Sequence, residues 1–218
     1  DYAVTGVQTC ALPIFVDILE SDSDITLVGH ASLIQNHRFP NFQRVWKVKD
    51  GFLNMDEVIR ERGILFANNA VMVRANVLNY PEYSKMLLVQ DTKRVISAGL
   101  TGKIFAINEV MSVYQQGIPG SWTDRTRFNA QKMIKHYQSE YQFFMEFDLQ
   151  TNNKYHESVQ SVLDLLNYLI ALHEQNSDCF KGDYHNSLLI RTRFKNRFHF
   201  IFPKFYLSLG RIRYRYFI

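Results

Sequence analysis

The sequence predicts an α/β layer followed by an α-helical hairpin and a basic, aromatic tail. Three observations predict this order. In the first half, short apolar or β-branched runs alternate with helical patterns. In Arg125–Phe147 and Tyr155–Asn176, apolar residues recur at three- and four-residue steps. From Arg191 to Ile218, aromatic residues alternate with eight Lys or Arg, and Asp and Glu are missing.

The first fourteen residues, DYAVTGVQTCALPI, are expected to lie outside the fold. They show no clear period, no helix cap and no continuation into the helix that follows. Val4–Ile14 is similar to the conceptual translation of a common sequencing adapter, so we interpret residues 1–14 as an artefact. A short native strand is the alternative. On the first interpretation Cys179 is the one native cysteine, which leaves no disulfide framework and favours a reducing compartment.

The α/β layer begins with a helix whose last turns are Phe15–Glu20, followed by a turn and a strand over Ile25–Ile34. Gln35–Asp50 is polar and is predicted to be a loop. Its three aromatic side chains either line a pocket or anchor the loop: Phe39, Phe42 and Trp46.

A short helix is predicted after Asn54, which can cap it, and Gly63 ends it. A strand follows around Ala70–Arg74. Asp91 then stands at the cap or first turn of another helix, which Gly99 or Gly102 ends.

Two short strands, Lys103–Ile107 and Val110–Tyr114, complete the layer. The two long helical patterns come next, and Thr151–Lys154 is predicted to be the turn between them. No run of 18 apolar residues occurs, so no transmembrane helix is expected.

The order of features from Leu87 to Trp122 carries a family resemblance. An acid at a helix entry precedes a Gly-containing turn, two apolar strands, and a loop with Pro119, Gly120 and Trp122. Over roughly Phe15–Thr126 this order resembles the acceptor half of a family 2 glycosyltransferase, an inverting enzyme that uses a nucleotide-sugar and has a GT-A fold.

Together, these patterns and the resemblance predict four parts. Residues 1–14 are the artefact, 15–126 the C-terminal half of the glycosyltransferase domain, 127–190 a helical appendage, and 191–218 the basic aromatic tail. The intact enzyme is expected to hold a divalent cation, Mg or Mn, on an Asp-x-Asp motif upstream of Phe15. We therefore expect this chain to be an inactive fragment. The implied acceptor is a glycan or a lipid-linked sugar in surface polysaccharide synthesis.

By the same resemblance, Asp91 is the catalytic base. Inverting transfer needs a group that accepts the proton of the attacking hydroxyl, and a carboxylate can do so. The alternative is that Asp91 only caps its helix.

The resemblance also implies that Gly120 and Trp122 lie near the sugar and the acceptor. Trp122 offers an apolar face for a sugar ring, and Gly120 permits a turn that side chains would block. The family usually carries an Arg where this chain has Gln115, which keeps a donor but loses the charge. The alternative is a loop whose tryptophan is folded into the core.

Asn68 and Asn69 match small polar residues at the floor of the family's site, where Asn69 could bond sugar hydroxyls; a polar turn is the alternative. Arg74 and Arg94 are candidate anion contacts, although the sequence favours solvated or paired arginines.

Asp22-Ser23-Asp24 is literally an Asp-x-Asp sequence. However, it falls in a helix-to-strand turn rather than at a strand end, so we assign no metal ligand in this chain. The seven histidines show no metal-binding spacing.

The basic tail allows three interpretations. Such a segment can lie on an anionic membrane surface, contact RNA, or pack its aromatics on the long helices. A lipid-linked acceptor favours the membrane over nucleic acid. We therefore expect a cytoplasmic location, with peripheral attachment to the inner membrane face as an option. A non-catalytic membrane or nucleic-acid binding module remains the alternative function.

Overall fold

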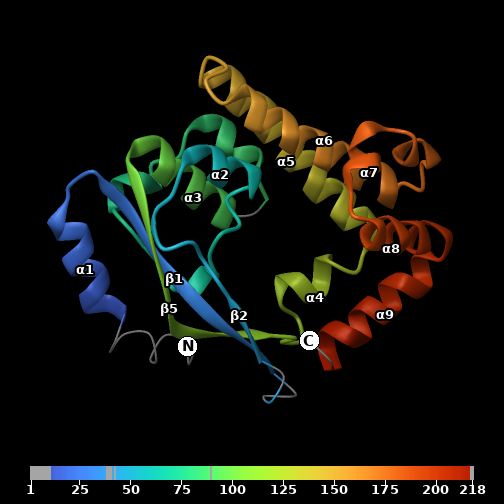
Figure 1. Ribbon diagram of the computed structural model, residues 1–218, viewed down its shortest axis with the longest axis horizontal. Helices are drawn as coiled ribbons and strands as arrows, with labels where there is room; N and C mark the ends of the chain where they lie inside the picture. The colour runs from blue at the N-terminus through green and yellow to red at the C-terminus, as the bar shows by residue number, and fades with distance from the viewer. Residues whose placement is uncertain (1–10, 38–40, 42, 89, 217–218) are drawn as a thin grey trace. The chain divides into compact units, whose positions relative to one another are not determined.

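The computed structural model describes residues 11–37, 41, 43–88 and 90–216, and the fold is mixed α/β with a curled mixed sheet (Figure 1). The chain divides into two compact units. Unit 1 takes the described residues before Gly117 except His37, and unit 2 takes His37 and the described residues from Gly117 onwards.

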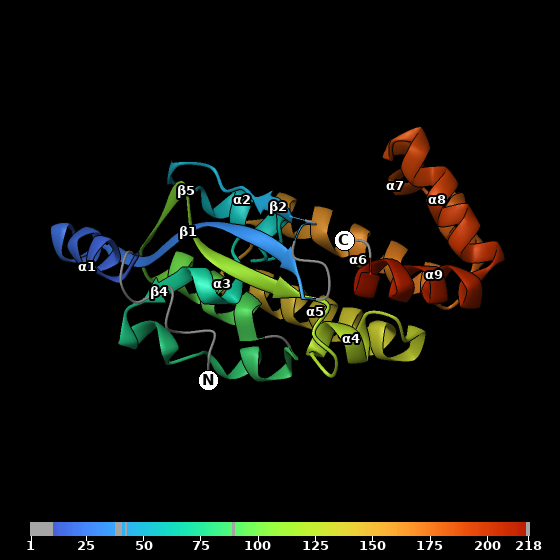
Figure 2. The ribbon, with the colours of Figure 1, turned by 90° about the horizontal axis from the view of Figure 1, so that it is seen from below.

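Two long parallel strands form the centre of the sheet in unit 1 (Figure 2). These are β1 (Ile25–Asn36) and β5 (Lys103–Gln116). Short antiparallel strands complete the sheet: β3 (Gly51–Phe52) beside β5, and both β2 (Gln43–Trp46) and β4 (Val71–Val73) beside β1.

The predicted loop over Gln35–Asp50 is partly wrong. Strand β1 continues to Asn36, and β2 pairs with its second half, although Gln43, Arg44 and Val45 are exposed. Backbone pairing rather than an apolar pattern therefore makes this edge strand. Trp46 lies edge-on to Tyr114, with ring centroids 6.3 Å apart. The other two aromatics, at positions 39 and 42, lie outside the described residues.

The prediction of two strands between Lys103 and Tyr114 is also wrong, because β5 is continuous. The register against β1 shifts between Ile107 and Val110. There the backbone N–H of Asn108 donates to the Asp50 carboxylate at 2.9 Å. The polar pair at 108–109 thus marks an irregularity within one strand rather than a strand end.

Helices cover both faces of the sheet. Helix α1 (Ala11–Ser21) packs Phe15 against a face that includes Phe105. The opposite face carries Ile104, which lies against Gly99 of α3 (Gln90–Thr101) and Met55 of α2 (Met55–Arg60). Neighbouring residues of a strand point to opposite faces, so α1 and the α2–α3 pair enclose the core between them.

Helix α1 corrects the expectation for residues 11–14. They form its first turn, and Ala11 is fully buried against the sheet. These four residues therefore do continue into the helix. Residues 1–10, including Cys10 and the alternative strand, lie outside the described part, and the adapter origin stays a prediction.

The short elements between β3 and β5 match most of the predictions. The Asn54 side chain accepts from the Asp56 N–H at 2.8 Å and caps α2. Gly63, with φ +68°, follows the helix end, and its N–H donates to the Val58 carbonyl. Helix α3 runs through Gly99 and ends before Gly102. The 3₁₀ segments are η1 (Asn68–Ala70), η2 (Ala75–Leu78) and η3 (Glu82–Met86).

Unit 2 contains the predicted hairpin of α5 (Ala130–Gln150) and α6 (His156–His173), which run side by side (Figure 1). Helix α5 starts later than the predicted Arg125, because Asn129 caps it and Arg125 belongs to α4 (Trp122–Thr126). The remaining elements are η4 (Ser177–Phe180), α7 (Asp183–Ser187), α8 (Ile190–Ile201) and α9 (Pro203–Tyr216).

The helical unit begins ten residues before the expected boundary at 127. Strand β5 ends at Gln116, and the next helix, α4, packs Trp122 on His136 of α5. The Pro-Gly-Ser-Trp loop therefore belongs structurally with the helices rather than with the sheet.

Candidate functional site around Asp91

Asp91 lies in the first turn of α3, within the range that the sequence predicts. The preceding 3₁₀ turn η3 follows Pro81, and its Ser84 hydroxyl donates to the Pro81 carbonyl at 2.7 Å. Helix α3 then buries Val95 and Ile96 in the core of unit 1. These buried side chains hold α3 in place, and the helix in turn positions the Asp91 carboxyl.

The Asp91 carboxyl is half-buried, and this burial raises its pKa above the ordinary value of 3.8. The positive charge of Arg94, one turn further along, opposes the shift without cancelling it. A carboxylate that binds a proton more readily than usual is suited to accepting one from an acceptor hydroxyl.

Arg94 links Asp91 to the two asparagines of η1. Its guanidinium donates to Asn68 Oδ1 at 2.8 Å, so it is paired, as the alternative interpretation held. Asn69 Nδ2 donates to the Val113 carbonyl at 3.0 Å and ties η1 to β5. The structure therefore gathers Asp91, Asn68 and Asn69 in one region of unit 1.

The hydrogen bonds of Asn69 favour a structural role. Its amide N–H is used by β5, and its Oδ1 is buried without a hydrogen-bond partner among the described residues. Asn68 is more exposed than Asn69. Its hydrogen bond to Arg94 connects it with the first turn of α3, where Asp91 lies.

Gln115 lies on β5, two residues beyond the Val113 that Asn69 contacts. Its Nε2 donates to Gln35 Oε1 at 2.8 Å across the parallel pair of strands. Both side chains of this exposed pair are neutral. Gln35 therefore does not replace the positive charge that an Arg at position 115 would carry.

Gly120 and Trp122 form a turn and a helix start in unit 2. Gly120 has φ +77°, a left-handed conformation that favours glycine, and its N–H donates to Asp124 Oδ2 at 3.2 Å. Ser121 caps α4 by accepting from the Asp124 N–H. Trp122 is 42% exposed, and its edge contact with His136 at 5.2 Å leaves part of the indole open.

The predicted site residues therefore fall into two groups. Asp91, Asn69 and Gln115 belong to unit 1, whereas Gly120 and Trp122 belong to unit 2. Arg94 connects Asp91 with the two asparagines of η1, whereas Gln115 contacts Gln35 instead.

Asp22 and Asp24 lie in the turn between α1 and β1, as the sequence predicts. Both carboxylates contact the Lys103 ammonium, at 3.0 and 3.2 Å. The N–H of Asp24 and then Lys103 lower the pKa of Asp22. A lysine already occupies the position between the two acids, so they do not fit a divalent cation. Within the described ranges, no group of three or more His, Cys, Asp or Glu could hold a metal.

Arg74 also has a structural role. Its guanidinium donates to the carbonyls of Ile25 and Leu19, which joins the start of β1 to the end of α1. The sequence does not distinguish Arg74 from Arg94, because the carbonyls that Arg74 contacts belong to residues distant in the chain.

A row of rings in unit 2 was not predicted. Tyr137 lies 5.8 Å from His173, which lies 4.8 Å from His199, and His199 stacks on Tyr206 at 4.3 Å. Burial, then the neighbouring His173 and Lys195, lower the pKa of His199 to about 4. Four different helices supply these rings, so no sequence spacing reveals them.

Comparison with known proteins finds no matching family model, no matching curated protein and no matching solved structure. None of the helices in the described residues has the length and apolar character needed to cross a membrane.

Proposed function

We propose that this chain forms the acceptor side of an inverting, nucleotide-sugar-dependent glycosyltransferase of family 2, with Asp91 as the catalytic base. The half-buried carboxyl of Asp91, whose pKa is raised, carries the proposal. The mixed α/β fold is compatible with a partial GT-A sheet layer, and the resemblance over Phe15–Thr126 supplies the family.

In the proposed reaction, the acceptor hydroxyl oxygen attacks the anomeric carbon of the donor sugar. The bond between that carbon and the diphosphate breaks, the nucleoside diphosphate leaves, and the hydroxyl proton passes to Asp91. Arg94 and Asn68 orient the acceptor near this carboxylate. A glycan or lipid-linked sugar of surface polysaccharide synthesis fits this scheme. The divalent cation expected in the intact enzyme would be held by the upstream Asp-x-Asp motif, so no step is assigned to it here.

Turnover of the full-length gene product tests the role of Asp91. Asp91→Asn keeps the size of the side chain but removes the base, so transfer should fall by about 100-fold or more. Asp183→Asn is the matched control, since Asp183 is an exposed first-turn acid of α7. Unchanged glycan output in Asp91→Asn would overturn the proposal and favour the non-catalytic binding module. Sugar transfer by residues 15–218 alone would contradict the expectation that the donor side lies outside them.

The thermal stability of Asp91→Asn distinguishes two roles of Asp91, as a catalytic base or as a charge that stabilises the start of α3. An acid whose pKa is raised on folding costs stability as pH rises above its unfolded value of 3.8, and the full cost remains at pH 7. Asp91→Asn should therefore unfold at the same or a higher temperature than the wild type at pH 7. If Asp91 mainly complements the helix dipole, the variant should instead lose about 0.3–1 kcal/mol.

A further inference from the structure

Helix α8 and the start of α9 expose a row of large apolar side chains. In α8 the row contains Ile190, Phe194, Phe198 and Ile201, which are 65%, 70%, 39% and 64% exposed. At about 100° per residue, these four positions fall within about 80° of the helix circumference. We call this row the α8 stripe.

The stripe continues around the corner into α9. Phe198 lies 5.4 Å from Phe202 and 6.1 Å from Phe205, measured between ring centroids. Phe202 and Phe205 are themselves 52% and 57% exposed. The two helices therefore present one continuous apolar surface, since the rings contact each other and remain open to solvent.

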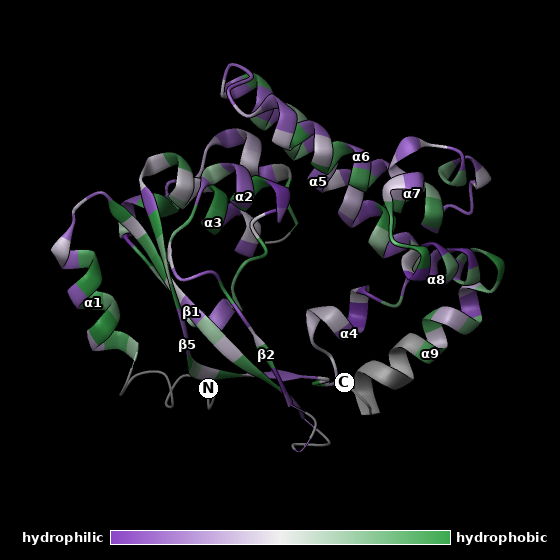
Figure 3. Cartoon of the chain, in the orientation of Figure 1, coloured by the Kyte–Doolittle hydropathy of each residue, from purple (hydrophilic) through white to green (hydrophobic). Residues whose placement is uncertain are grey.

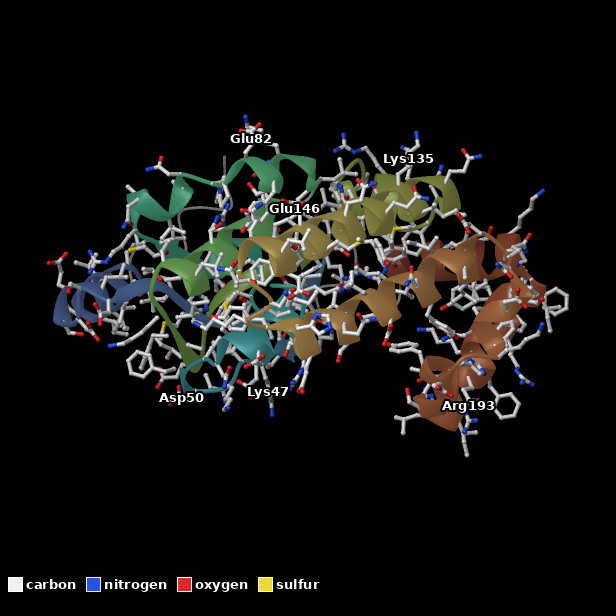
Figure 4. All side chains as sticks on the ribbon, turned by 90° about the horizontal axis from the view of Figure 1, so that it is seen from above. Lys47, Asp50, Glu82, Lys135, Glu146 and Arg193 are labelled. Carbon is white, nitrogen blue, oxygen red and sulfur yellow. The ribbon has the colours of Figure 1, made fainter. Side chains whose placement is uncertain are left out.

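Basic side chains border the α8 stripe on both sides. By helical position, Arg193 and Arg197 lie on one side of the stripe, and Arg191 and Lys195 lie on the other. His199 lies on the opposite face of α8 and is buried against unit 2. Figure 3 shows hydrophobic and hydrophilic positions alternating along α8, and in Figure 4 the Arg193 side chain extends away from the ribbon.

A small cleft lies at this border. It has a volume of about 270 Å³ and is lined by Ile190, Arg193, Phe194 and Arg197. Two guanidinium groups thus stand beside two apolar side chains. Guanidinium binds phosphate oxygens through paired hydrogen bonds, whereas the apolar pair suits hydrocarbon.

The positive charge around the α8 stripe indicates which kind of partner binds it. Residues 191–218 contain eight Lys or Arg and no acid. Among the described residues, none of the four basic side chains beside the stripe forms an ion pair with a carboxylate. We propose that the α8 stripe and its basic borders are a docking surface for an anionic phospholipid bilayer, with α8 lying in the plane of the interface.

Aliphatic side chains favour a bilayer over RNA as the partner. Leu189, Ile190 and Ile201 are 78%, 65% and 64% exposed. Nucleic-acid surfaces use aromatic or guanidinium planes on which bases stack, and aliphatic chains provide no such plane. In contrast, aliphatic and phenyl groups together gain free energy from insertion below lipid headgroups.

Flotation of the full chain with vesicles tests the proposal. The chain should float with vesicles of phosphatidylcholine and phosphatidylglycerol in equal parts, and much less with phosphatidylcholine alone. Arg193→Gln with Arg197→Gln should weaken binding by about fivefold for each charge removed, and high salt should do the same. Ile190→Ser with Phe194→Ser should abolish flotation at any salt concentration.

Matched controls come from exposed residues elsewhere. Arg44→Gln with Arg60→Gln removes the same charge from unit 1, and Leu149→Ser removes an apolar group that is 62% exposed. These variants should float like the wild type.

Two other outcomes would overturn the proposal. In the first, the wild type fails to float but binds single-stranded poly-U through Arg193 and Arg197, with no effect of Ile190→Ser and Phe194→Ser. In the second, the wild type fails to float and forms a dimer that those serine substitutions dissociate in sedimentation. Circular dichroism of each variant must match the wild type, so that lost binding reflects the surface and not unfolding.

Discussion

Helices α5 and α8 use similar aromatic residues in opposite ways. Phe143, Phe144 and Phe147 of α5 are at most 1% exposed, whereas Phe194 of α8 is 70% exposed. Helix α6 covers the aromatic face of α5, and no described element covers the α8 stripe. Helix α5 carries acids and bases together, while α8 carries bases and no acid. Aromatic content alone therefore does not decide burial; a packing partner and the sign of the flanking charges do.

The largest expected effect contrasts the two phenylalanine sets directly. Phe147→Ala should cost about 3–5 kcal/mol of unfolding free energy, because its ring is fully buried against Phe144 and Tyr155. Phe194→Ala should change stability by less than about 0.5 kcal/mol. Denaturant unfolding in a Trp46→Phe background checks this, since Trp122 then reports on unit 2. Equal losses from both variants would show that the α8 stripe is covered in solution.

An intermediate effect comes from the buried histidine at the back of the α8 stripe. The pKa of His199 drops from 6.5 to about 4 on folding, so the folded state resists protonation. Stability should therefore be lost as pH falls from 6.5 towards 4, by about 3 kcal/mol in total. His199→Phe keeps an aromatic ring beside His173 and Tyr206 and should reduce this dependence, while His173 and His185, whose pKa values are also lowered, keep their share. Identical pH slopes in wild type and variant would contradict the assignment.

The smallest effect concerns the turn that brings α6 onto α5. Asn153 has φ +59°, which asparagine tolerates better than most residues, and its N–H donates to the Asp148 carbonyl. Asn153→Ala should cost about 1 kcal/mol, measured by thermal unfolding. Asn167→Ala, at an exposed helical position of α6, should be neutral or slightly stabilising. A neutral Asn153→Ala would mean that packing alone sets the hairpin.

Local signals predicted most elements of the fold. The cap at Asn54, the glycine after α2 and the apolar spacing of α5 and α6 each act within a few residues, so the sequence displays them. The failures involve distant partners. Strand β2 depends on pairing with β1, and the continuity of β5 through Asn108 depends on Asp50.

The candidate site shows the same limit. A first-turn acid is visible in the sequence, but its burial and its neighbour Arg94 are not. The resemblance predicted Asn69 as the sugar-binding residue. In the structure, however, Asn69 donates to β5, and Asn68 is the residue that contacts Arg94. The fit of Trp122 on His136 could not be predicted either, because it joins two helices through side chains alone.

The parallel pairing of β1 with β5 has a kinetic consequence. Ser32 and Ser112, whose hydroxyls meet at 3.1 Å, are 80 residues apart in the chain. The hairpin of α5 and α6 closes through a turn of a few residues. Chain closure over long separations is slow, so the helical unit should acquire its structure before the sheet does. During synthesis, β2 and β4 can pair with one edge of β1 early, but its other edge must remain unpaired until β5 has left the ribosome. That open edge is exposed to aggregation throughout the interval.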